Sequence, residues 1–272
     1  ALSDLEQWYE PRQGAPSTHI FKPENPSFPG VAKLEAAMLL AAENAGIQAT
    51  RAQVWQVDDT DVLVVQRWDR AQTDQGTTRL PAEDLCSTLG WDSNRKYQFE
   101  GGPSAPDITK WLTQHADAGE DIRFVEQLAF NIAIGNADAH SKNYSVLFDE
   151  HTVQLAPLYD SVPTIKWPDL DEALAMPIGG GQHINSVTQD RWLGFASRAN
   201  LDADLVLQKI TQIYAPLPQL LFEAMSQYLV DDRTIDYIAK RCSQATQKIS
   251  YTPPDIHPIV AAPTNTPPSM QL

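Results

Sequence analysis

The chain has 272 residues, of which 42% are hydrophobic and 20% charged, an ordinary globular composition with enough length for a large core or two lobes. Its formal net charge of −15 argues against direct nucleic-acid binding, which rests on clustered Lys and Arg, but leaves a cation site or a basic protein partner open. No stretch reaches the roughly 18 apolar residues of a membrane span, and no signal-peptide pattern begins the sequence. We therefore expect a cytoplasmic protein without membrane contact.

Residues 1–70 predict a strand, a helix and two further strands. Alternating residues favour strands at 17–22, 52–57 and 61–68. An apolar helical pattern runs from Val31 to Gly46, between the first two strands. Asp58 and Asp59 are expected in a solvated turn between the last two.

Residues 71–250 predict a mostly helical unit that contains one hairpin. A polar loop at 70–78 leads into it. Helical patterns are expected at 81–90, 104–117, 120–135 and from 187 to 249, and the hairpin strands at 144–148 and 153–159. The glycines at 179–181 lack the lysine and serine of a phosphate-binding loop, so we expect a turn there.

Two cysteines and a terminal segment carry little chemistry. Cys86 and Cys242 lie far apart in helical patterns without metal-ligand spacing, so both are expected to be reduced core thiols. Residues 251–272 hold six of the chain's 20 prolines. This composition predicts a proline-rich tail, extended or disordered, with no core of its own.

Polar side chains concentrate where the helical pattern of 120–135 ends, in GNADAHSKNYSVLF. Asp138 and Asn143 are five positions apart, and Asp160 follows the second hairpin strand. Phosphoryl transfer from ATP needs a carboxylate beside the attacking hydroxyl, and an amide with a second carboxylate to hold Mg²⁺. The D-x-x-x-x-N spacing is that of a protein-kinase catalytic loop, although a helix C-cap followed by a solvated loop would give the same fragment.

Two upstream residues fit the same chemistry. A kinase needs a strand lysine that reaches the ATP phosphates and a helix glutamate that holds this lysine. Lys22 ends the first predicted strand, and Glu35 lies one turn into the following helix. Singly, each is explained as a solvent-facing charge, but their conjunction with the downstream cluster favours a kinase.

Eight segments in order resemble the HipA-type serine/threonine kinases of bacterial type II toxin–antitoxin systems. They are APSTHIFKP, VQRWDR, LPAEDLCSTLG, KYQFEGGPS, GNADAHSKNYSVLF, LAPLYD, AMPIGG and LDADLVLQKI. The resemblance covers about residues 15 to 212. It implies an α+β, two-lobed protein-kinase-like fold, with a strand-rich N-lobe at 1–70 and a mostly helical C-lobe at 71–250 that contains a catalytic β-hairpin.

The resemblance also implies a role for each polar residue of the cluster. Asp138 corresponds to the catalytic base, Asn143 and Asp160 to the metal ligands, and Lys22, held by Glu35, to the lysine on the ATP phosphates. ATP and Mg²⁺ are the implied cofactors.

Further residues are assigned to the adenine and the phosphoryl group. The backbone of Gln66 and Trp68 would bond the adenine edge while Trp68 covers the ring; its alternative is an ordinary strand aromatic. Lys142 would neutralise charge on the transferring phosphoryl group. His140 would bond the nucleotide or brace the loop, and its alternative is a structural histidine.

The implied reaction is phosphorylation of a serine or threonine on a protein substrate, expected to be an aminoacyl-tRNA synthetase, so that tRNA charging and growth stop. The expected partner is a small DNA-binding antitoxin. Two alternatives stay open: a catalytically inactive kinase-like module that binds nucleotide or antitoxin, and phosphoryl transfer to a small molecule.

Family kinases carry a glycine-rich segment with an autophosphorylated serine, and a further subdomain, upstream of the phosphate lysine. Here 21 residues precede Lys22, with Gly14 as the one glycine among them. We expect a short or N-terminally truncated member, or one whose N-terminal subdomain is a separate protein. Nucleotide binding without the upstream loop is expected to be weak and transfer slow.

Overall fold

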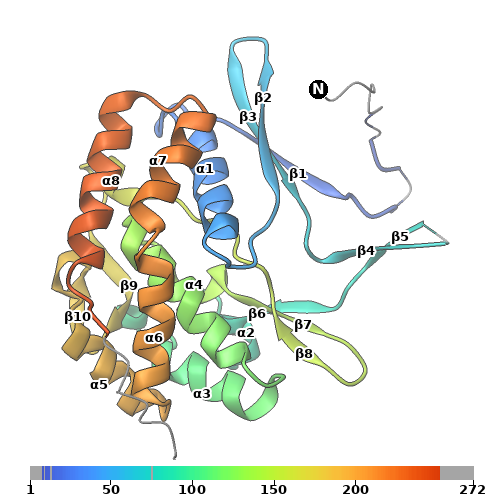
Figure 1. Cartoon of the computed structure of the whole chain (residues 1–272). Helices are drawn as coiled ribbons and strands as arrows, with labels where there is room; N and C mark the ends of the chain where they lie inside the picture. Colours follow the sequence, from blue (N-terminus) through green and yellow to red (C-terminus); the bar gives the residue numbers. More distant parts are fainter. Residues whose placement is uncertain (1–7, 9, 13, 75, 252–272) are drawn as a thin grey trace, which may run out of the picture.

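The computed structural model describes residues 8, 10–12, 14–74 and 76–251. The predicted tail therefore lies, from residue 252 on, outside the described residues. Within them the chain forms small sheets beside a helical body (Figure 1).

A three-stranded antiparallel sheet with the order β1-β3-β2 comes first. It consists of β1 (His19–Pro23), β2 (Ala52–Val57) and β3 (Thr60–Gln66). Helix α1 (Val31–Asn44) packs on this sheet, with Ala32 and Ala36 against Leu63 and Val65. The predicted order of strand, helix, strand and strand is confirmed, as is the exposed turn at 58–59.

The predicted polar loop at 70–78 is wrong, because the segment contains a hairpin of β4 (Arg70–Thr73) and β5 (Gly76–Arg79). Its strands are held by polar cross-strand contacts such as the hydrogen bond from Gln72 to Thr77, at 3.0 Å. Because most of the hairpin is exposed, it has no alternation of apolar residues from which a strand could be read.

The helix predicted at 81–90 is also partly wrong. Residues Ala82–Asp84 form β6, which pairs with β7 (Ser145–Phe148), and helix α2 covers only Leu85–Thr88. The side chain of Asp84 accepts a hydrogen bond from the Ser87 backbone N–H at 2.9 Å and so caps this helix. Pairing with a distant strand therefore overrides the local helical pattern before Leu85.

The predicted hairpin is confirmed, with a shorter second strand than expected. Strand β8 covers Val153–Leu155 and pairs with β7. Pro157, which has no backbone N–H to donate, follows two residues after the strand ends.

The remaining elements form the helical body. They are α3 (Ala105–His115), α4 (Glu120–Ile134), α5 (Gln189–Ala199), α6 (Ala203–Tyr214), α7 (Leu217–Gln227) and α8 (Asp232–Thr246), the strands β9 (Ala173–Ile178) and β10 (Gly181–His183), and single 3₁₀ turns at Gln98–Glu100, Ser141–Asn143, Thr164–Lys166 and Ile184–Ser186. The glycine turn is confirmed between β9 and β10. Both cysteines are buried and free, as predicted.

One hydrophobic core runs through the helices and positions the polar segment at 135–143. Helix α4 is buried along most of its length, and α1 contributes Leu34 and Met38 to the same core. Helices α1 and α7 lie side by side (Figure 1). The division into two lobes at residue 70 stays a prediction.

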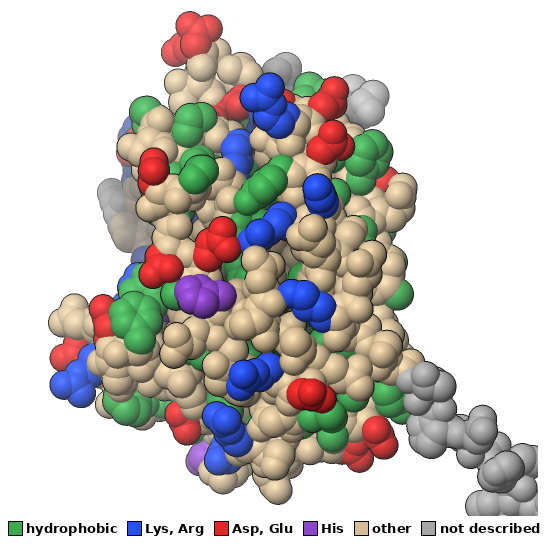
Figure 2. Space-filling view, turned by 90° about the vertical axis from the view of Figure 1, so that its left-hand side faces the viewer, with side chains coloured by type: hydrophobic (Ala, Val, Ile, Leu, Met, Phe, Trp, Pro, Cys, Tyr) green, Lys and Arg blue, Asp and Glu red, His purple; other side chains and the backbone are tan. Residues whose placement is uncertain are grey.

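Among the described residues, no helix is long and apolar enough to cross a membrane. On the face that Figure 2 shows, Lys and Arg side chains lie among acidic, hydrophobic and uncharged ones.

Gly135, which ends α4, provides a test of how this helix is joined to the polar segment. Its φ is 83°, and a Cβ there would overlap the side chain of Ile165. We expect Gly135→Ala to lower the free energy of unfolding by about 2 to 4 kcal/mol, from backbone strain plus overpacking. Urea denaturation measures this loss.

Gly119, at the other end of α4, is the matched control. Its φ is 91°, and a Cβ there meets nothing within 4 Å. Gly119→Ala should therefore cost only the backbone strain, about 1 kcal/mol. Equal losses for the two variants would contradict the proposed overlap with Ile165.

Candidate active site

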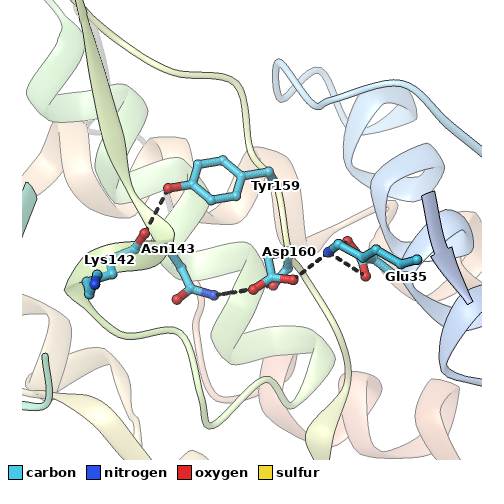
Figure 3. A network of polar contacts seen from close by, with 6 residues as sticks. Glu35, Lys142, Asn143, Tyr159 and Asp160 are labelled. Carbon is cyan, nitrogen blue, oxygen red and sulfur yellow. Dashed lines mark hydrogen bonds and ion pairs between the residues drawn. The ribbon is translucent and has the colours of Figure 1, made fainter. Parts of the chain in front are cut away.

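A chain of polar contacts connects the first sheet to the polar segment at 135–143 (Figure 3). The Nζ atom of Lys22, on β1, donates to Glu35 Oε1 and to Asp160 Oδ1, each at 2.9 Å. Glu35 is only 4% exposed, whereas the side chains of Lys22 and Asp160 are 39% and 51% exposed. The structure thus brings together the predicted lysine, its glutamate and a predicted metal ligand.

Burial and charge act in opposite directions on this cluster. Burial alone would lower the pKa of Lys22, but Glu35 and Asp160 outweigh it and raise that pKa above its usual value. Burial raises the pKa of Glu35, and Lys22 only partly offsets this effect. The buried carboxylate therefore depends on the lysine for its charge.

Asn143 joins the same network from the 3₁₀ turn at the end of the polar segment 135–143. Its Nδ2 atom donates to Asp160 Oδ2 at 3.2 Å. Asp160 has a φ of 53°, an uncommon conformation for a residue other than glycine. The predicted metal ligands are therefore adjacent, and the backbone at Asp160 is held in a left-handed turn.

Tyr159 fixes the position of this turn and was missed by the sequence reasoning. Its hydroxyl donates to the backbone carbonyl of Lys142 at 2.8 Å and lies 2.7 Å from Ser145 Oγ. Lys142 enters the network through this carbonyl, while its side chain points away from Asn143 and Asp160 (Figure 3). The signal for Tyr159 was its place in LAPLYD, directly before Asp160.

A buried asparagine, also missed, links the two segments that carry the polar residues. Asn131 lies on α4 and is 2% exposed. Its Oδ1 accepts from Asn136 Nδ2 at 2.9 Å and from Ser161 Oγ at 2.7 Å. One side chain thus ties the segment before Asp138 to the residue after Asp160.

Asp138 lies after Gly135, apart from the Lys22 network. The hydroxyl of Tyr97 donates to Asp138 Oδ1 at 2.7 Å. Burial, followed by this bond to Asp138, raises the pKa of Tyr97, so the phenol stays protonated and remains a donor. Tyr97 was not predicted, and the signal was its place in KYQFEGGPS.

His140 is buried beside Lys96, a residue that was also missed. The Lys96 Nζ atom lies 2.9 Å from His140 Nε2. Burial lowers the pKa of His140, and Lys96 adds to this effect although Asp138 opposes it. A neutral ring that accepts from Lys96 carries its proton on Nδ1, a buried atom that has no hydrogen-bond partner among the described residues.

The two residues predicted to bind adenine lie beside the Lys22 network. Gln66 and Trp68 line a cavity of about 200 Å³ together with Lys22, Glu35 and Asp160. The rings of Trp68 and Tyr159 lie 5.5 Å apart. The Gln66 backbone N–H donates to the Arg51 carbonyl at 2.9 Å, so its contribution to an adenine edge would be its own carbonyl.

The donor set of Asn143 and Asp160 fits Mg²⁺ held jointly with phosphates. Among the described residues there is no cluster of three or more His, Cys, Asp and Glu side chains that could hold a metal ion. Magnesium in phosphoryl-transfer sites usually takes one or two carboxylates, with the substrate phosphates supplying further ligands. The adjacent amide and carboxylate meet that requirement.

Comparison with known proteins places the chain in a family. Residues 2–220 match the HipA-like C-terminal domain, so the chain belongs to that family. It is 33% identical over 235 residues to the putative kinase Y4mE of Sinorhizobium fredii, covering 84% of this chain and 56% of that protein. It is 26% identical over 225 residues to the serine/threonine-protein kinase toxin HipA of Shewanella oneidensis, covering 77% and 51%.

Solved structures show the same fold. The HipA chain in the Shewanella oneidensis MR-1 complex of HipA, HipB and operator DNA has a TM-score of 0.74 at 24% identity, over 85% of this chain and 57% of that one. The Helicobacter pylori proinflammatory kinase CtkA has a TM-score of 0.51 at 13% identity, over 84% and 87%. The chain thus has the mixed α/β fold of these proteins, and it spans about half the length of the curated relatives it matches.

The pairing of Lys22 with buried Glu35 is tested by stability against pH. Lys22→Met leaves the carboxylate unpaired, which we expect to cost about 2 kcal/mol at neutral pH, discounted because Lys22 is partly exposed. Since the pKa of Glu35 is already raised in the folded state, and rises further without Lys22, the loss should shrink as the pH falls through that pKa. Urea denaturation from pH 4 to 8 measures it.

The double variant Lys22→Met/Glu35→Gln is the control. It replaces the pair by two neutral side chains, so most of the stability should return at neutral pH. A loss for Lys22→Met that does not change with pH would show that the pairing with Glu35 is not its cause.

Proposed function

We propose that the chain is the catalytic part of a HipA-type serine/threonine protein kinase, with ATP and Mg²⁺ between a strand-rich lobe at 1–70 and a helical lobe at 71–250. The observation that carries this proposal is the contact of Lys22 with Asp160, together with the Asn143 amide on the same carboxylate. These are the lysine, the carboxylate and the amide that phosphoryl transfer needs, gathered from three distant segments. The kinase names of the relatives support it.

The residues of the network would share the binding of the nucleotide. Lys22, held by Glu35, would turn from Asp160 to the phosphate oxygens. Asn143 and Asp160 would hold Mg²⁺, which when bound neutralises charge on the phosphates. Gln66 and Trp68 would take the adenine, in the cavity that they line next to Lys22.

Asp138 would act on the acceptor. Its carboxylate would accept the hydroxyl proton as the hydroxyl oxygen bonds the γ-phosphorus and the bond to the β–γ bridging oxygen breaks, with ADP leaving. The acceptor hydroxyl would replace or join Tyr97 at this carboxylate. His140, held by Lys96, would brace the loop, or would bond a phosphate if its buried Nδ1–H became exposed, and Lys142 would have to turn toward the transferring group to neutralise it.

The substrate and partners of the proposed kinase follow from the family resemblance. An aminoacyl-tRNA synthetase is the proposed protein substrate, and arrest of growth the outcome. The solved HipA relative forms a complex with HipB and operator DNA, so a small DNA-binding antitoxin is the proposed partner here, without direct contact of this chain with nucleic acid. A separate protein could supply an N-terminal subdomain. The proposed location is the cytoplasm.

One observation favours a second candidate, an inactive kinase-like module that binds nucleotide or antitoxin. Both reactive carboxylates are engaged within the chain, Asp138 by Tyr97 and Asp160 by Lys22. Nucleotide binding without any phosphoryl transfer by the unmodified chain would support this module. ATP turnover without a labelled protein would instead indicate a small-molecule acceptor.

Asp138→Asn tests the proposed base. It removes the proton acceptor but keeps the shape of the side chain, so transfer should fall by about 10²- to 10⁴-fold while ATP affinity stays nearly unchanged. Phosphoserine and phosphothreonine formed with ATP-Mg²⁺ are measured by mass spectrometry. Asp149→Asn, in the turn between β7 and β8, is the control and should transfer normally. Undiminished transfer by Asp138→Asn would remove Asp138 as the base.

Asp160→Asn tests the metal site. We expect ATP to bind more tightly with Mg²⁺ than without it, and this difference to fall at least about tenfold in the variant, since a charged ligand is lost. Calorimetric titration of ATP with and without Mg²⁺ measures both affinities. If the Mg²⁺ dependence is the same in both proteins, the metal binds elsewhere.

A further inference from the structure

A second cavity, of about 500 Å³, has Asp138 in its wall. None of the residues that line the candidate nucleotide cavity lines this one. The volume falls in the range of about 300 to 1,000 Å³ that is usual for ligand sites. The group that would receive the acceptor proton and the groups that would hold the phosphates thus open onto different cavities.

Four aromatic side chains line this second cavity, alongside five aliphatic ones. Phe28 and Trp167 meet edge to face, with their centroids 5.4 Å apart, and Tyr97 and Phe99 stack at 5.1 Å. Phe99 is 71% exposed, more than any other Phe, Tyr or Trp side chain in the described part of the chain. An exposed aromatic group at the mouth of an apolar cavity is typical of a binding surface.

We propose that this cavity binds a large apolar side chain of the protein substrate, close in sequence to the serine or threonine that is phosphorylated. The proposal rests on the kinase function proposed above and adds a substrate class to it. The hydroxyl must reach Asp138, and the segment that carries it would lie along the wall formed by Tyr97 and Phe99.

The position of Asp138 favours a peptide over the nucleotide as occupant. If the adenine filled this cavity, the proposed base would face the ring, while Lys22 and Asp160 would still face the other cavity. A peptide that enters this cavity instead meets Asp138 directly, and its hydroxyl approaches the phosphates from the cavity that the nucleotide does not occupy. An extended chain advances about 3.4 Å per residue, so the apolar side chain should lie within about two residues of the acceptor.

Peptide libraries with one central serine test the proposal. Each library peptide is incubated with the chain, ATP and Mg²⁺, and phosphate incorporation is followed by mass spectrometry. Peptides with Leu, Met, Phe or Trp within two positions of the serine should have kcat/KM about tenfold above those with Ala, as expected for an apolar subsite.

Phe99→Ala is the decisive variant, because a side chain this exposed contributes little to folding. The preference for apolar residues should fall to about threefold or less through KM, with kcat and the affinity for ATP unchanged. Phe99→Leu should keep most of it. Phe222→Ala, on α7 and 49% exposed, is the matched control and should keep all of it.

The outcomes separate the subsite from the kinase function. Transfer without an apolar preference, or a preference that Phe99→Ala does not change, overturns the subsite alone. A loss of ATP affinity in Phe99→Ala would assign the cavity to the nucleotide and also overturn it. If the unmodified chain phosphorylates no peptide, the proposed function fails. Fluorescence anisotropy with labelled peptides that carry alanine in place of the serine then tests the docking site by itself. The docking site stands if the peptides with an apolar neighbour bind more tightly than those without one, and it falls if they do not.

Discussion

The contact between Lys22 and Asp160 is the interaction on which the candidate site depends, because it is the point where the first sheet meets the polar segments of the helical body. Glu35 holds the lysine from α1, and Asn143 holds the carboxylate from the other side. Three charges this close are stable only when they alternate in sign, so loss of the lysine leaves two carboxylates facing each other. A nucleotide with its metal would supply the positive charge and the phosphates that this arrangement accommodates.

The rigid support for this contact comes from the buried end of α4. Asn131 bonds both the segment before Asp138 and the residue after Asp160, and Gly135 allows the chain to turn against Ile165. A satisfied buried polar network of this kind fixes one geometry, since each member would be costly to leave unpaired. The candidate catalytic residues are therefore positioned by the core, although they themselves lie on loops.

The two cavities provide separate binding sites for the two substrates of the proposed reaction. The groups proposed to bind the phosphates line the smaller cavity, and Asp138 lines the larger one, which also has four aromatic residues in its wall. In the proposed reaction, the acceptor hydroxyl at Asp138 must reach the phosphates held by Lys22 and Asp160. Tyr97, which bonds Asp138 and stacks on Phe99, connects the carboxylate to the wall that the acceptor segment would contact.

The sequence by itself determined the strongly patterned elements and the set of polar side chains from which the candidate site was predicted. The apolar repeat of α4 and the spacing of Asp138 and Asn143 are local features, so they can be read without a fold. Tertiary structure alone decided which distant groups meet: Tyr97 on Asp138, Lys96 on His140, and Asn131 across two segments. The pairing of β6 with the distant β7 was missed for the same reason, whereas the local hairpin of β4 and β5 was missed because its exposed strands carry no apolar alternation. Cross-strand pairing and buried polar bonds join residues far apart in the chain, and no local pattern encodes such partners.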